Sequence, residues 1–175
     1  AIGFNNTANG IDSSAVGHQN EANGTASSAF GYQNEANGDF STALGANSTA
    51  AADFSLTIGN SADGEPGTFV GVGASNGIAI GRNAAVAAAS VNAIAVGTGA
   101  SAIAANTVAM GAGSVATEAN TVSVGDVDAE RRVVNVAAGT TGTDAATVYP
   151  LDAGDSHAHE GAAEAAGAQA TAEAA

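Results

Sequence analysis

The segment Ser13-Ser14-Ala15-Val16-Gly17 returns fourteen residues later as Ser27-Ser28-Ala29-Phe30-Gly31. The same spacing relates most glycines of a longer series, which consists of Gly3, Gly17, Gly31, Gly45, Gly59, Gly97, Gly111 and Gly125. Between Gly59 and Gly97 the period shifts, and Gly71 and Gly81 are the predicted equivalents. A large apolar residue precedes each of these glycines. Such self-similarity indicates a repeat architecture.

Each repeat predicts two short strands, one over the Ser-x-Ala-apolar-Gly segment and one over the alanine-rich segment that follows. The Asn-Gly pairs at 9–10, 23–24 and 37–38 tolerate the positive φ angles of turns. A unit of fourteen residues is too short to add a crossover helix. The sequence therefore predicts an all-β coil of parallel strands, with the residues one and three before each glycine facing the interior.

Composition limits the classes of function. The chain has 175 residues, a net charge of −14, three basic residues and no cysteine. So few basic residues argue against contact with nucleic acid, and the lack of cysteine excludes disulfides and thiolate metal sites. The lack of a long apolar segment argues against membrane insertion by this segment. A thin core with an exposed face of Ala, Val and Ile predicts self-association.

Three units carry a resemblance to a known family. The segments 13–17, 27–31 and Asn106-Thr107-Val108-Ala109-Met110-Gly111 resemble the head repeats of trimeric autotransporter adhesins, the YadA-like family. Residues 120–125, followed by Glu130-Arg131-Arg132-Val133-Val134-Asn135-Val136-Ala137-Ala138-Gly139 and then Thr143-Asp144-Ala145, resemble the neck of that family.

The resemblance implies a left-handed parallel β-roll in each chain and a homotrimer of three rolls. It also implies an extracellular location at the cell surface, with an outer-membrane anchor outside this segment or release as a fibre. Within the neck, the resemblance points to Arg131, Arg132, Asn135, Gly139 and Asp144 as structural residues. We expect Arg131 and Arg132 to pair with acidic residues across subunits.

Three segments are predicted from these patterns. They are a β-roll head over residues 1–125, a neck-like segment over 126–150, and a flexible Ala/Glu/Gly-rich tail or degenerate stalk start over 151–175. Pro150 stands where a stalk helix would begin, and no heptad pattern follows it. The chain begins at Ala1 without a signal-like stretch, so we expect a mature form or a fragment.

The residues that resemble reactive sites are better explained as parts of turns or of low-complexity sequence. The glycines Gly71, Gly73 and Gly77 have the spacing of a phosphate-binding loop but lack its helix and lysine, and they are predicted to be repeat turns. His157 and His159 lie in a low-complexity stretch, and His18 is predicted to face solvent in a turn. No nucleophile is accompanied by a base and an orienting residue, so we predict no enzyme, no cofactor and no metal site.

Columns of like residues at the repeat spacing suggest ladders. Glu21 and Glu35 should stack one turn apart, as should Asn20 and Asn34. Ser13, Ser27, Ser41 and Ser55 form one hydroxyl column, and Ser14, Ser28 and Thr42 form another. We expect the hydroxyl groups of these columns to form hydrogen bonds with neighbouring strands.

Three functions fit the sequence. The first is a non-catalytic adhesin head that attaches to host matrix, cells or other surfaces. The second is a structural subunit of an extracellular fibre or phage-type appendage built from the same module. The third, an ice- or glycan-binding solenoid, requires an accessible hydroxyl ladder.

Overall fold

A computed structural model describes residues 1–61, 67–141 and 143–145. The chain divides into two compact units, Ala1–Arg131 and Arg132–Ala175. Over the described residues the regular structure consists of strands, all of which belong to the first unit. In that described part, no helix is long and apolar enough to cross a membrane.

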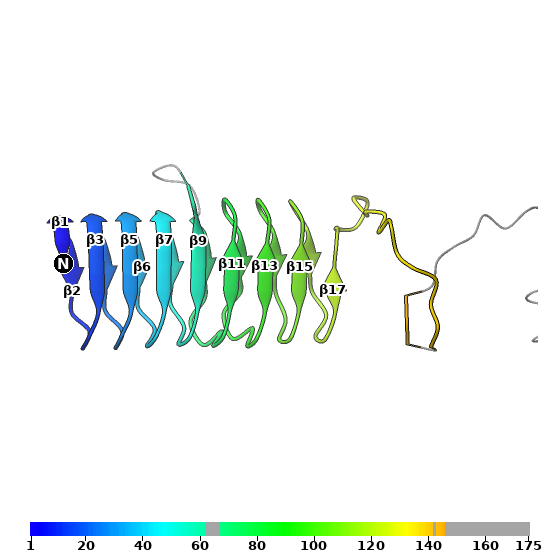
Figure 1. Cartoon of the computed structure of the whole chain (residues 1–175), viewed down its shortest axis with the longest axis horizontal. Coiled ribbons are helices and arrows are strands. Elements are labelled where there is room, and N and C mark those ends of the chain that lie inside the picture. Colours follow the sequence, from blue (N-terminus) through cyan, green and yellow to red (C-terminus); the bar gives the residue numbers. More distant parts are fainter. Residues whose placement is uncertain (62–66, 142, 146–175) are drawn as a thin grey trace, which may run out of the picture. The chain divides into compact units, whose positions relative to one another are not determined.

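The first unit is a coil whose successive turns contribute one strand to each of two parallel sheets (Figure 1). The nine-stranded sheet contains β1 (Ile2–Phe4), β3 (Ser14–His18), β5 (Ser28–Tyr32), β7 (Thr42–Ala46), β9 (Leu56–Asn60), β11 (Ile78–Ile80), β13 (Ile94–Val96), β15 (Val108–Met110) and β17 (Val122–Ser123). The eight-stranded sheet contains β2 (Thr7–Ala8), β4 (Glu21–Ala22), β6 (Glu35–Ala36), β8 (Thr49–Ala50), β10 (Phe69–Val70), β12 (Ala85–Val86), β14 (Ser101–Ala102) and β16 (Val115–Ala116).

Strand register confirms the glycine period. Gly3, Gly17, Gly31, Gly45 and Gly59 lie opposite one another on consecutive strands. Gly81, Gly97 and Gly111 each directly follow β11, β13 and β15, which pair in register. The predicted equivalence of Gly81 is therefore confirmed.

The predicted equivalence of Gly71 is wrong. Val70, which precedes it, lies in β10 and pairs with Ala50 and Val86 in the eight-stranded sheet. The nine-stranded sheet continues instead from Leu56 directly to Ile78, 22 residues later. A local Val-Gly pair therefore resembles the repeat without occupying its position.

The interior is narrower than the sequence suggested. The residues two before the glycines, such as Ala15, Ala29 and Ala43, are completely buried. On the facing sheet, Ala22 and Ala36 are also completely buried. The prediction that residues one and three before each glycine face inward is wrong, because alternation places them on the outer face of the sheet.

One corner of the coil interior contains an asparagine ladder. The Nδ2 of Asn34 donates to Oδ1 of Asn20 at 2.9 Å and to the carbonyl oxygen of Gly45 at 2.8 Å. Both asparagines are completely buried. Their predicted ladder is confirmed, and it supplies hydrogen bonds to backbone groups that would otherwise be buried without partners.

Candidate interaction surface

The outer side of the nine-stranded sheet carries a continuous row of large apolar side chains, which we call the apolar face. Its first column comprises the residues directly before the glycines: Ile2, Val16, Phe30, Leu44, Ile58, Ile80, Val96 and Met110. Leu44 is 42% exposed and Met110 is 52% exposed. These side chains point outward because the inward-facing positions of this sheet have room only for small residues.

The apolar face becomes two columns wide from β9 onward. In β3, β5 and β7 the second outward position holds Ser14, Ser28 and Thr42. From β9 that position holds Leu56, Ile78, Ile94, Val108 and Val122. A contiguous apolar surface of this extent is typical of an interface rather than of a monomer's solvent-exposed face.

A shallow depression crosses this face. Its volume is about 460 Å³, and it is lined by Leu44, Ile58 and Ile80 together with Gly45, Gly59 and Gly81. A Cβ on Gly45 or Gly81 would overlap the backbone of Gly59 or Gly97 on the next strand, so these glycines permit the close approach of the strands. Ala46, Asn60 and Arg82, which follow these glycines in the sequence, complete the lining of the depression.

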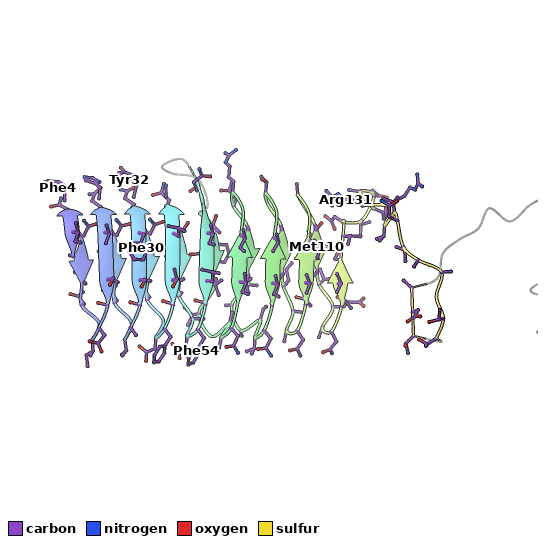
Figure 2. All side chains as sticks on the ribbon, in the orientation of Figure 1. Phe4, Phe30, Tyr32, Phe54, Met110 and Arg131 are labelled. Atoms are coloured by element: carbon purple, nitrogen blue, oxygen red, sulfur yellow. The ribbon has the colours of Figure 1, made fainter. Side chains whose placement is uncertain are left out.

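An aromatic stack lies at the ends of the first strands, near the labelled Phe4 and Tyr32 in Figure 2. The ring of His18 is 5.4 Å from that of Phe4 and 5.2 Å from that of Tyr32, centroid to centroid, and the three rings are nearly parallel. His18 ends β3 and is half-buried, so its predicted position in a solvent-facing turn is wrong.

A polar groove runs beside this stack. It has a volume of about 380 Å³ and is lined by Gln19, Gln33, Glu21, Glu35 and Asn47. Glu21 and Glu35 pair in register on β4 and β6, which confirms their predicted stacking but places them in strands rather than turns. The groove offers amide and carboxylate groups for hydrogen bonding.

The serine columns differ in exposure. Ser27, Ser41 and Ser55 lie inside the coil, with at most 2% of their surface exposed. The Oγ of Ser55 donates to the carbonyl oxygen of Ala52 at 2.6 Å. This column is therefore inaccessible to ice or a glycan.

Arg131 closes the last turn of the first unit. Its guanidinium donates to Oγ of Ser114 at 2.9 Å, to the carbonyl oxygen of Val124 at 2.7 Å and to that of Ala112. These partners belong to its own chain and are neutral. These contacts hold the Arg131 side chain within its own chain, and its predicted pairing with acidic residues of another subunit stays a prediction.

The other predicted neck residues lie in the second unit. The carboxylate of Asp144 accepts hydrogen bonds from the backbone N–H of Thr140 at 2.7 Å and of Thr141 at 3.0 Å. These bonds hold the pKa of Asp144 below its ordinary value. A Cβ on Gly139 would lie 3.1 Å from that of Asp144. Arg132 is exposed, and Asn135 adopts a positive φ of 61°.

The described side chains include histidines, aspartates and glutamates, which are possible metal ligands. Among them, no group of three or more His, Cys, Asp or Glu residues is arranged to hold a metal ion. His157, His159 and the predicted tail over 151–175 lie outside the described residues.

Comparison with known proteins identifies the repeat. The model of the YadA head domain repeat matches residues 1–20, 22–48, 36–62, 88–114 and 102–126. Among solved structures, the chain is similar to the collagen-binding domain of the Yersinia adhesin YadA, with 27% sequence identity and a TM-score of 0.51. That similarity covers 83% of this chain and 82% of the YadA domain. No curated protein matches the chain.

The fold predicted from the sequence, an all-β parallel solenoid with turns of about fourteen residues, is confirmed by the strand register, and a homotrimer is consistent with the match to YadA. The matched segments include more than half of the chain. This protein therefore belongs to the YadA head family and is the head of a YadA-like trimeric autotransporter adhesin.

Proposed function

We propose that this chain is a non-catalytic adhesin head that acts as a homotrimer outside the cell and attaches to host matrix or cell-surface ligands. It is displayed at the cell surface, where an adhesin meets such ligands. The observation that carries the proposal is the apolar face, which runs along the nine-stranded sheet and is incompletely covered within the chain. The similarity to a collagen-binding domain supports an adhesive role.

The apolar face supplies the surface for trimer formation. Three copies would bury Phe30, Leu44, Ile58 and their neighbours around a common axis, because a closed symmetric assembly covers the same patch on every copy. Burial of these side chains stabilises the assembly in proportion to the apolar area removed from water. The depression beside Leu44 and Ile58 gives large side chains of a neighbouring copy a place to pack.

A charge on the apolar face tests this arrangement. The double variant Leu44→Asp/Ile58→Asp should weaken trimer assembly by roughly 100-fold or more, because it buries unpaired carboxylates in every copy. Sedimentation should report a species of 16.4 kDa in place of one of three times that mass, about 49 kDa. Circular dichroism should be unchanged, since both side chains point away from the core.

Thr49→Asp provides the matched control. Thr49 lies on β8, next to the buried Ala50, and faces outward from the eight-stranded sheet beside Glu35. It should leave the trimer intact. A wild-type chain that sediments as a stable monomer at micromolar concentration would contradict the proposed assembly.

Attachment is tested separately with collagen-coated surfaces. The wild-type trimer should bind saturably, whereas the Leu44→Asp/Ile58→Asp monomer should bind more weakly because it loses multivalency. Trimers that bind neither collagen nor host cells would contradict the adhesive role and favour the structural fibre subunit instead.

A further inference from the structure

One corner of the coil carries a column of residues in the left-handed backbone conformation. The column lies just before the strands of the nine-stranded sheet and comprises Asp12, Ala26, Phe40, Phe54, Asn76, Asn92, Asn106 and Asn120, with φ between 53° and 63°. Backbone hydrogen bonds place these residues on successive turns, as in Phe54 N–H to Asp39 O and Asn76 N–H to Asp53 O.

Asparagine is the residue that this column favours. The amides of Asn76, Asn92, Asn106 and Asn120 form a continuous ladder, with N–O distances of 2.9, 3.0 and 3.2 Å. Asparagine tolerates positive φ better than other non-glycine residues. In the second half of the coil, asparagine therefore both adopts the positive φ of this column and forms side-chain hydrogen bonds from turn to turn.

Phe40 and Phe54 depart from this arrangement. Both have positive φ angles, of 57° and 56°, which are unfavourable for bulky side chains. Their rings stack with centroids 5.2 Å apart and planes within 3°. Nevertheless the two residues are 56% and 59% exposed, so they contribute little to the core. Every residue of the column shares this backbone conformation, so the coil imposes it, and the two phenylalanines present an aromatic surface to solvent there.

The surroundings of the rings are acidic. Asp39 and Asp53 directly precede the two phenylalanines and are exposed. The Oδ1 of Asp39 accepts from the N–H of Thr25 at 2.7 Å, and Oδ1 of Asp53 accepts from the N–H of Asp39 at 3.0 Å. The second oxygen of each carboxylate has no partner among the described residues.

Basic residues are absent from this corner. The chain has no lysine, and its three arginines are Arg82, Arg131 and Arg132. Arg82 follows Gly81 at the opposite end of the strands of the nine-stranded sheet. Figure 2 shows Phe54 at the lower corner, away from Phe4, Tyr32 and Arg131. Charge complementarity therefore favours a cationic partner at the Phe40–Phe54 corner.

The end of the stack nearest Ala26 can receive a flat group. Ala26 occupies the turn next to Phe40 in the column and carries only a methyl group. No third ring therefore covers Phe40 on that side within the described residues. A planar cation fits such a position, because arginine stacks on aromatic faces and also pairs with carboxylates.

We propose that Phe40, Phe54, Asp39 and Asp53 form a binding site for an arginine side chain of a partner polypeptide. The guanidinium stacks on the exposed side of Phe40 and pairs with the carboxylate of Asp39, while Phe54 holds the first ring in place and Asp53 adds negative charge. This site deepens the adhesive function proposed above, since it assigns residues and a ligand chemistry to the attachment surface.

The test uses the wild-type chain and the double variant Phe40→Asn/Phe54→Asn. Binding of the peptide acetyl-(Gly-Arg)4-amide is measured by NMR titration, with the citrulline analogue as the uncharged control. The wild type should bind the arginine peptide, more weakly at high salt. The double variant should lose about tenfold in affinity. Asp39→Asn should also weaken binding, since it removes the paired charge.

Stability separates a binding role from a structural one. Asparagine suits the positive φ at both positions and can extend the amide ladder from Asn76, so the double variant should melt at the same temperature as the wild type or higher. A lower melting temperature or an altered sedimentation mass would show that the rings pack in the fold or assembly, and would overturn the proposal.

Other outcomes also overturn it. Equal binding of the citrulline peptide would remove the role of charge, and binding of maltohexaose in place of the arginine peptide would assign the corner to a glycan. If the double variant keeps full attachment to collagen and neither chain binds the arginine peptide, this site is wrong while the adhesive function stands.

Discussion

At the scale of single residues, Gly31 shows why the repeat requires glycine. Its φ is +123°, and a Cβ at this position would lie 2.0 Å from the carbonyl oxygen of Gly45 on the next strand. Gly31→Val should therefore lower the free energy of unfolding by about 2–4 kcal/mol, through backbone strain and overlap with a rigid neighbour. Thermal melting followed by circular dichroism measures the change.

Gly99 is the matched control for this substitution. It also has a positive φ, of 66°, but a Cβ there would have no neighbouring atom within 4 Å. Gly99→Ala should lower the stability by only about 1 kcal/mol, the usual effect of a side chain in the left-handed region. If both substitutions have the same small effect, close strand contact does not explain the glycine period.

At the scale of elements, the structure predicts that Arg131 holds the last turn of the first unit in place. Arg131→Ala removes the hydrogen bonds to Ser114 Oγ and to the carbonyl oxygens of Ala112 and Val124. We expect the free energy of unfolding to fall by roughly 1–2 kcal/mol. Hydrogen bonds from a charged donor are strong, but the exposure of the Arg131 side chain to solvent reduces their contribution. Hydrogen exchange of the Val115 amide, which bonds to Gly125 O, should accelerate.

Arg132→Ala separates this effect from a general loss of charge. Arg132 is the next residue and is exposed, so its removal should change the stability of the turn by less than about 0.5 kcal/mol. Faster exchange in both variants, to the same extent, would contradict a specific role for Arg131.

The strands and their period were predictable from the sequence. The side of each strand that faces the interior was not. Alternation in Ser14-Ala15-Val16 divides the side chains into two sets without saying which set is inside. General hydrophobicity favoured Val16 for the core, but in this narrow coil Ala15 is buried and Val16 is only half-buried. The volume inside the coil decides which side chains point inward, and that volume depends on the distance between the two sheets.

Ladders were predictable only where the column repeats one residue type. Asn20 and Asn34 are identical and were recognised one turn apart. Phe4, His18 and Tyr32 form an equally regular stack, yet they are three different residues. A search for residues with like side-chain shape at the fourteen-residue spacing, rather than identical residues, would have found both this stack and that of Phe40 with Phe54.

At the scale of the whole molecule, the structure predicts separable roles for the two units. Residues 1–131 include every described strand and the Arg131 contacts. A chain ending at Arg131 should keep the β-content of the coil, but its trimer should dissociate at a higher protein concentration. Val133 and Val134, which are 66% and 59% exposed, would then be unavailable for burial between subunits.

Sedimentation over a dilution series measures this difference, with the 175-residue chain as the control. Equal dissociation constants for the two chains would show that the apolar face alone holds the trimer and that residues 132–175 add nothing to its stability.

The in-register pairing of turns has a consequence for how such heads change length during evolution. Each strand bonds only to the turns before and after it, so duplication or deletion of one whole unit in the gene preserves the pairing of all others. Each event would alter the reach of the coil by about 4.8 Å. The steps of 22 residues from Leu56 to Ile78 and 16 from Ile78 to Ile94 show that corners also absorb unequal insertions. The coil is thus a spacer whose reach can be adjusted independently of the chemistry it displays.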